Sequence, residues 1–121
     1  MQTEKFTNRT RGFLESAQGL AIRSAHQNFT PEHILRVLLD DAEGLAANLI
    51  TTAGGRPTEA LEHVEAALGK MPKVEGPGAG QVYLARETAR LLDSAEQLAK
   101  SSGDRLVTAE RLLLALVTAA D

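Results

Sequence analysis

The sequence contains no cysteine and no tryptophan, and it has only three phenylalanines and one tyrosine among its 121 residues. The lack of cysteine excludes disulfide bonds and thiolate metal sites. The scarcity of aromatic rings leaves Leu, Ala, Val and Ile to build a core, which suits helices whose backbones approach closely. A chain of this length with 43% hydrophobic residues is typical of one globular domain. We therefore expect a single domain with an aliphatic core.

The sequence also lacks an excess of positive charge. Thirteen basic residues against sixteen acidic ones give a net charge of −3, and no basic cluster is present, which argues against a nucleic-acid-binding protein. The amino-terminal stretch "MQTEKFTNRTRG" has no apolar segment of the kind found in signal peptides. The longest strongly apolar run, Leu112 to Val117, is too short to cross a bilayer. These features predict a soluble, cytoplasmic protein without nucleic-acid or membrane partners.

Residues with catalytic or metal-binding potential do not form a recognisable set. His26, His33 and His63 have no partner at helical i, i+4 spacing, so we expect no metal site. The glycine-rich stretch "GPGAGQ" lacks the lysine and the following serine or threonine of a phosphate-binding P-loop. No Ser-His-Asp or Cys-His combination is indicated. The chain is therefore expected not to be an enzyme and not to hydrolyse ATP by itself.

A helical period dominates the sequence and occurs twice. Apolar and small residues fall at positions 6, 10, 13, 17, 20 and 24, in steps of four and three that are typical of one helix face. The same series returns at positions 84, 88, 91, 95, 98 and 102, so every member has a counterpart at one constant offset. Between 6–39 and 84–117, eleven of 34 positions are identical, including Thr10/Thr88 and Leu20/Leu98. We therefore predict a tandem repeat of a small helical unit.

The helix starts in both copies carry favourable capping residues. Thr7 is a good N-cap for the first helix, because its hydroxyl accepts from a backbone N–H without a helical partner. Thr30 is placed in the same way before "PEHILRVLLD", where Pro31 occupies the first helical position without losing a hydrogen bond. Thr108 is the counterpart of Thr30 in the second copy and is expected to open the last helix.

The two predicted copies differ in length. Copy one spans 1–69 and includes two shorter helices that end at glycines, whereas 70–82 is rich in proline and glycine and is predicted to be a linker. Copy two, 83–121, contains counterparts of only the first two helices, so it is expected to be truncated. Its last helix should bury Leu112, Leu113, Leu116 and Val117, yet the missing partners should leave an apolar face exposed there.

Four stretches of the chain match a known family: "EKFTNRTRGFLESAQGLA", "NFTPEHILRVLLDD", "GKMPKVEG" and "GDRLVTAERLLLAL". With them the whole chain resembles the amino-terminal domain of the Clp ATPases. The Met-Pro-Lys-Val-Glu-Gly linker favours the ClpB type, an AAA+ chaperone and disaggregase, over the ClpA and ClpC types.

This resemblance implies an all-α fold of two pseudo-repeated helical bundles, the double-Clp type of amino-terminal domain. It also implies that the domain captures unfolded or aggregated polypeptide for a homohexameric AAA+ ring, which threads it through a central pore with ATP and magnesium. The ring is expected to work with an Hsp70-type chaperone system. No cofactor is expected in this domain itself.

The resemblance further assigns substrate handling to three polar residues, Thr7, Asp104 and Glu110. Each of them also has a simpler structural interpretation. Thr7 is the predicted helix cap, Asp104 follows Gly103 in a turn, and Glu110 lies in a first helical turn where the helix dipole favours an acid. Both roles are compatible, because a residue that caps a helix can also face a groove.

The family's apolar peptide groove maps onto Ser94, Leu98 and Arg111. Only Leu98 is aliphatic here, so the apolar area removed from water on binding, worth about 25 cal/mol per Å², should be small. Leu98 is also a candidate core residue, since Leu20 takes its place in copy one. We therefore expect weak binding in this groove.

Two other functions compete with substrate capture. The first is an adaptor-docking amino-terminal domain of a Clp protease ATPase of the ClpA or ClpC type, against which the linker sequence argues. The second is a stand-alone helical enzyme, which nothing in the residue inventory supports.

Overall fold

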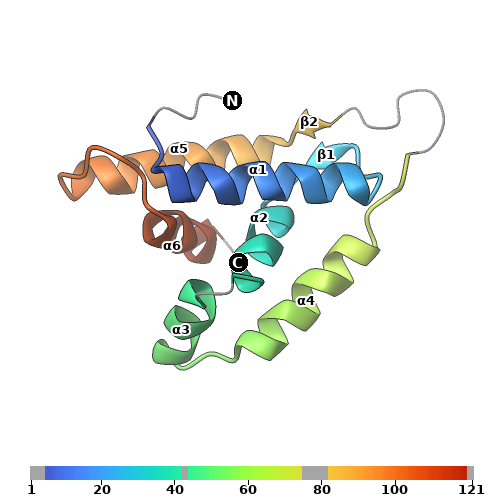
Figure 1. Cartoon of the computed structure of the whole chain (residues 1–121), viewed down its shortest axis with the longest axis horizontal. Helices are drawn as coiled ribbons and strands as arrows, with labels where there is room; N and C mark the ends of the chain where they lie inside the picture. Colours follow the sequence, from blue (N-terminus) through green and yellow to red (C-terminus); the bar gives the residue numbers. More distant parts are fainter. Residues whose placement is uncertain (1–4, 42–43, 75–81, 120–121) are drawn as a thin grey trace.

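The computed structural model describes residues 5–41, 44–74 and 82–119. Most of the described chain is helical, which confirms the predicted all-α fold class (Figure 1). The helices are α1 (Asn8–Arg23), α2 (Pro31–Leu39), α3 (Leu45–Thr52), α4 (Pro57–Gly69), α5 (Arg86–Ser101) and α6 (Ala109–Ala119). Two short strands, β1 (Asn28–Phe29) and β2 (Tyr83–Leu84), were not predicted from the sequence. Part of the predicted linker, residues 75–81, lies outside the described residues.

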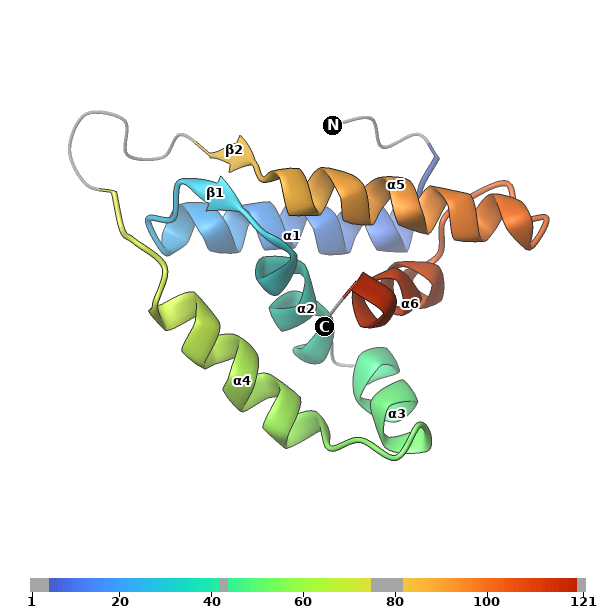
Figure 2. The same ribbon diagram turned by 180° about the vertical axis from the view of Figure 1, so that it is seen from behind.

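The helices pack mainly as two pairs. α1 packs against α2, and α5 packs against α6, while α4 lies along α2 and next to α3 at the outer edge (Figure 2). α6 also contacts α1, α2 and α3, and α5 contacts α2, so both helices of the second pair contact the rest of the domain. None of the described helices is long and apolar enough to span a bilayer.

The segments that precede the helices pair across the two copies, so they are exchanged between the two helix pairs. The segment before α1 pairs with the segment before α6, and the segment before α5 pairs with the segment before α2. β1 runs parallel to β2 with Phe29 opposite Leu84, and Phe6 forms a parallel bridge with Val107. In the predicted repeat, Leu84 is the counterpart of Phe6, and Val107 is the counterpart of Phe29. The two contacts are therefore equivalent: replacing each residue of one contact by its counterpart gives the other contact. The backbone hydrogen bonds that follow this relation are Thr7 N–H to Val107 C=O at 3.0 Å and Ala85 N–H to Phe29 C=O at 3.2 Å. These reciprocal contacts support the predicted duplication.

The two long helices also end alike. After α1, Ala25 has a left-handed φ of +59°, and Gly103 after α5 has a φ of +78°. In both places the next N–H returns to the last helical turn, from His26 to Ala21 at 3.0 Å and from Asp104 to Ala99 at 2.8 Å. This is the usual way to satisfy carbonyls at a helix C-terminus, and glycine adopts it with least strain.

Replacing Ala25 with glycine should therefore stabilise the domain. The left-handed backbone costs an L-residue about 1–2 kcal/mol, while the added freedom of glycine in the unfolded chain costs about 0.4–1 kcal/mol. We expect Ala25→Gly to raise the free energy of unfolding in urea by about 0.5 kcal/mol and Gly103→Ala to lower it by a similar amount. A decrease with Ala25→Gly would contradict the role given to this turn.

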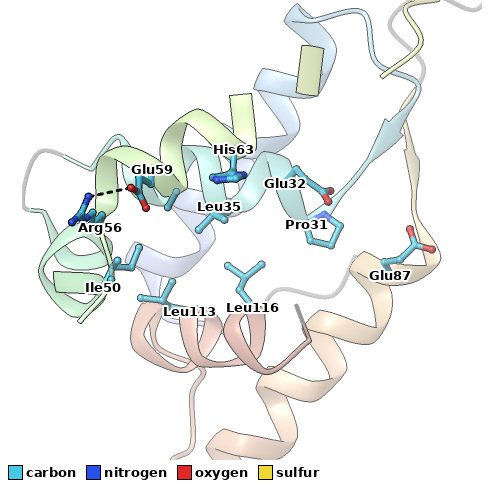
Figure 3. A pocket seen from close by; sticks show the side chains of 12 residues that line it. Pro31, Glu32, Leu35, Ile50, Arg56, Glu59, His63, Glu87, Leu113 and Leu116 are labelled. Carbon is cyan, nitrogen blue, oxygen red and sulfur yellow. Dashed lines mark hydrogen bonds and ion pairs between the residues drawn. The ribbon is translucent and has the colours of Figure 1, made fainter. Parts of the chain in front are cut away.

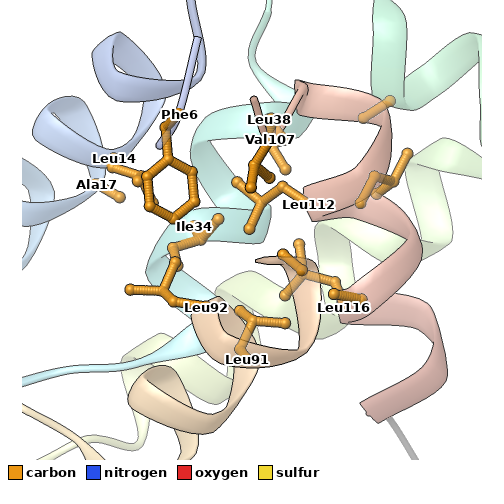
Figure 4. Packing of buried hydrophobic residues seen from close by; sticks show 14 of the residues in the cluster. Phe6, Leu14, Ala17, Ile34, Leu38, Leu91, Leu92, Val107, Leu112 and Leu116 are labelled. Carbon is orange, nitrogen blue, oxygen red and sulfur yellow. The ribbon is translucent and has the colours of Figure 1, made fainter. Parts of the chain in front are cut away.

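A mostly aliphatic core joins the two helix pairs. Side chains from α1, α2, α5 and α6 meet there, together with Phe6 and Val107 from the exchanged segments (Figure 4). The buried residues drawn are Phe6, Leu14, Ala17, Ile34, Leu38, Leu91, Leu92, Val107, Leu112 and Leu116. Thr88 is also fully buried, and its hydroxyl donates to the carbonyl of Phe29 at 2.6 Å, which ties α5 to the segment before α2.

The prediction of an exposed apolar face along the last helix is wrong for the described side chains. Leu112, Leu113 and Leu116 are buried, because α6 lies between α5 and the helices of copy one. Leu114 is 40% exposed. The side chain of Val117 lies outside the described residues. The predicted burial of Leu112, Leu113 and Leu116 is confirmed.

Candidate functional site

The residues predicted to handle substrate lie on neighbouring elements at one end of the domain, where α1 begins, α5 ends and α6 begins (Figure 1). We call this region the α5–α6 end. It contains Thr7 at the cap of α1, Leu98 in the last turn of α5, Asp104 in the following turn, and Glu110 and Arg111 in the first turn of α6. Ser94 lies midway along α5.

Thr7 connects α1 to the start of α6. Its hydroxyl accepts from the backbone N–H of Thr10 at 3.2 Å and forms a 2.7 Å hydrogen bond with the Thr10 hydroxyl. Its own backbone N–H donates to the carbonyl of Val107. The predicted capping role of Thr7 is therefore confirmed, and the residue remains half-exposed beside the segment that leads into α6.

Asp104 and Arg111 form an ion pair that the sequence did not reveal. Arg111 Nε donates to Asp104 Oδ2 at 3.1 Å, and about a third of each side chain is exposed. The backbone N–H of Arg111 donates to the Thr108 hydroxyl at 3.3 Å, as expected for a cap of α6. Glu110 is exposed in the first turn, where its charge complements the helix dipole. Asp104 lies in the turn before α6 and Arg111 lies on α6, so the spacing rules for side chains within one helix do not predict this ion pair.

The apolar surface at this end differs from the prediction. Leu98 is half-buried and packs against the core, so its role as a core residue is supported, and Ser94 lies half-buried one turn earlier. The exposed leucines are instead Leu106, before α6, and Leu114, one turn after Glu110 on α6. Sequence reasoning missed both, although the i, i+4 spacing of Glu110 and Leu114 was visible.

A larger groove lies between α2, α4 and α6 and contains none of the predicted site residues (Figure 3). Its volume is about 610 Å³, and Leu35, Leu113 and Leu116 contribute aliphatic side chains to it. Its charged lining is mostly acidic, and the arginine there, Arg56, pairs with Glu59 at 3.3 Å. No local sequence pattern predicts this groove, because it forms where three helices meet.

A second groove of about 430 Å³ lies between α1 and α2. We call it the α1–α2 groove. Its apolar residues are Phe13, Leu20 and Val37, with Ser16 between them on α1. The charged residues that line it are Arg23, Arg36, Asp40 and Asp41.

His26 and His33, for which the sequence predicts no metal-binding role, form a buried pair. His26 Nδ1 and His33 Nε2 lie 2.8 Å apart, and the backbone N–H of Thr30 donates to His33 Nδ1 at 3.0 Å. Burial and the neighbouring His26 lower the pKa of His33 to about 4. Burial and Lys73 also lower the pKa of His26. Within the described residues no group of three or more histidines and carboxylates is placed to hold a metal ion.

These features define a class of protein: a small helical domain built from two similar helix pairs, with capping residues and open grooves at its surface. The chain belongs to the Clp N-terminal domain family, because the family model described as Clp repeat (R) N-terminal domain matches residues 5–121. This confirms the resemblance seen in the sequence.

Comparison with individual proteins places the chain near ClpB chaperones. It is 62% identical over 116 residues to the chaperone protein ClpB of Rhodopseudomonas palustris and 57% identical to that of Mesorhizobium japonicum, and in both cases the match covers 96% of this chain. The Hsp104 N-terminal domain from Candida albicans has the same fold, with a TM-score of 0.83 at 22% identity over 94% of this chain and 74% of that one. The chain spans only 13% of the length of the two ClpB relatives.

Proposed function

We propose that this chain is the substrate-binding amino-terminal domain of a ClpB-type disaggregase, which captures unfolded or aggregated polypeptide at the α5–α6 end. The observation that carries the proposal is that Thr7, Asp104 and Glu110 lie on the elements that meet at this end, where Leu106 and Leu114 are exposed. The identity to ClpB proteins supports the assignment to this type of chaperone.

The composition of the α5–α6 end favours weak and unselective binding. Two partly exposed leucines remove little apolar area from water when a client chain covers them. The exposed Glu110 and the Asp104–Arg111 pair supply polar contacts to a client backbone without requiring a particular side chain. Such binding suits a domain that must take up many different unfolded chains and release each one to a ring.

The remaining steps of disaggregation are assigned to the parent protein. ATP and magnesium would act in its ATPase modules, and the captured chain would be threaded through a homohexameric ring assisted by an Hsp70-type chaperone system. The amino-terminal domain would raise the local concentration of client near the pore, which increases capture without any chemistry in the domain itself.

Titration of the ¹⁵N-labelled domain with an unfolded model protein tests the proposal. We expect amide shifts at Thr7, Leu106, Glu110 and Leu114, and we expect the double variant Leu106→Ser/Leu114→Ser to weaken binding about ten-fold because it removes most of the apolar contact. Ile22→Ser is the matched control, since Ile22 is 49% exposed at the opposite end of α1.

Two results would count against substrate capture. The first is an absence of shifts at the α5–α6 end, or equal losses in the control and the double variant. The second is a stoichiometric complex with one folded protein that unfolded chains do not displace, which would favour the adaptor-docking function of ClpA- and ClpC-type domains.

A further inference from the structure

We propose that the α1–α2 groove is a second polypeptide-binding site, which takes an apolar client segment with a carboxylate at the end that faces Arg23. The inference rests on the proposed function, because it assigns to copy one the kind of ligand assigned to the α5–α6 end. It is carried by a different set of residues and is tested separately.

The two helix pairs present equivalent faces. α1 and α5 both have 16 residues, and α5 starts at Arg86, the counterpart of Asn8, where α1 starts. Ser16 and Leu20 in the α1–α2 groove correspond to Ser94 and Leu98, the positions that the family resemblance assigns to the peptide groove. The same helix face is thus presented twice, once by each copy.

The two faces differ in how open they are. In copy two, the counterparts of Phe13 and Val37 are Leu91 and Ala115, and both side chains are buried. In copy one, Leu20, Phe13 and Val37 surround a cavity of about 430 Å³, a volume within the range of ligand-binding clefts. Phe13 and Val37 are only partly buried, so an entering side chain would cover apolar surface that is now exposed to water.

The charges of the groove are balanced at one of its ends. Asp41 pairs with Arg9 at 2.7 Å, and Arg36 pairs with Glu65 at 3.1 Å and with Asp40 at 3.6 Å. These pairs neutralise the end of the groove near the C-terminus of α2.

Arg23 at the other end has no ion-pair partner among the described residues. Its guanidinium lies back along α1 beside Gly19, where a β-carbon would approach Arg23 Nη1 to 3.1 Å. The glycine therefore leaves room for the cation to rest along the helix near Leu20. A carboxylate on the bound segment is the group that complements this cation.

Two short synthetic peptides test the proposal with the ¹⁵N-labelled 121-residue domain. Both share a central Leu-Val-Leu segment, and one carries glutamates on both sides while the other carries lysines. We expect the acidic peptide to shift the amides of Ser16, Leu20 and Val37 and to bind about five-fold more tightly than the basic one. Arg23→Glu should remove or reverse this preference.

The control is Arg90→Glu, which makes the same change of charge on an exposed part of α5 outside the residues that line the groove. It should leave the preference for the acidic peptide unchanged. Arg23 is exposed, so its replacement should not affect folding, and circular dichroism of both variants checks this.

The outcomes separate this proposal from the proposed function. Shifts confined to the α5–α6 end would overturn the second site and leave substrate capture intact, whereas no shifts anywhere, with these peptides and with an unfolded protein, would overturn both. Equal binding of the two peptides, or an unchanged preference in Arg23→Glu, would overturn the carboxylate assignment. Shifts at the groove that depend on protein concentration without peptide would identify a second copy as the occupant and would also overturn it.

Discussion

Lowering the pH from 7 to 5 is expected to reduce the free energy of unfolding by about 2 kcal/mol through His33 alone. In the unfolded chain His33 should titrate near the ordinary pKa of 6.5, whereas in the folded domain its pKa is about 4. The unfolded chain therefore binds a proton at a pH where the folded domain does not. Stability is retained above pH 6.5 and is lost progressively as the pH falls from 6.5 towards 4.

Burial, and after it the neighbouring His26, lowers the pKa of His33 and explains why the folded domain resists its protonation. Thr30 N–H donates to His33 Nδ1, so the neutral ring carries its proton on Nε2 and donates it to His26 Nδ1. Lys73 disfavours added positive charge on His26. Glu32 and a backbone hydrogen bond at Thr30 favour it on His33, but burial outweighs them.

Urea unfolding of the domain at several pH values between 5 and 7 measures this effect. His63→Gln, which removes an exposed histidine of α4, is the control for the loss of a histidine. His33→Leu should flatten it, whatever the stability of that variant at pH 7. Direct NMR titration of the His33 ring gives a second measurement that does not depend on a variant. A stability that stays constant between pH 7 and 5, or a His33 ring that titrates above pH 6, would contradict the prediction.

The helices were predictable from the sequence because their signals are local. The alternation of apolar residues from 6 to 24 predicted a helix that the structure places at Asn8–Arg23, and the threonine caps marked where helices begin. The strands β1 and β2 were missed, because each is only a dipeptide and exists through pairing with a segment far away in the sequence. The grooves escaped prediction for the same reason.

The candidate site was predictable only in part. The caps at Thr7 and Thr108 follow from residue type, but the Asp104–Arg111 ion pair does not. His26 and His33 occupy the corresponding positions in copy one, and there the same geometry is a buried neutral pair. One backbone arrangement thus brings together either two charges or two uncharged rings, and the choice depends on whether neighbouring elements bury the position. Near the end of α4, a backbone hydrogen bond between Leu68 and His26 raises the pKa of His26 against the effect of burial.

The second large effect is expected at Leu112, where α6 enters the common core. The side chain of Leu112 is fully buried, and α6 packs against α5 and also contacts α1, α2 and α3. Truncation of a buried leucine removes apolar contacts and leaves a cavity that neighbouring helices fill incompletely, which typically costs about 2–5 kcal/mol. We therefore expect Leu112→Ala to lower the free energy of unfolding by that amount.

Leu114→Ala provides a matched comparison for this prediction. Leu114 lies on the same helix but is 40% exposed, so its truncation should cost less than about 1 kcal/mol and should instead weaken client binding at the α5–α6 end. Urea unfolding of both variants separates the two roles within one helix. Equal and small losses of stability would mean that α6 is not held in the core, and the exchanged arrangement of the two helix pairs would then be wrong. We expect Leu112→Ala to lose much of its free energy of unfolding while its folded fraction binds client as the original domain does. Leu112 would then belong to the core that positions the site, and Leu114 to the surface that binds client.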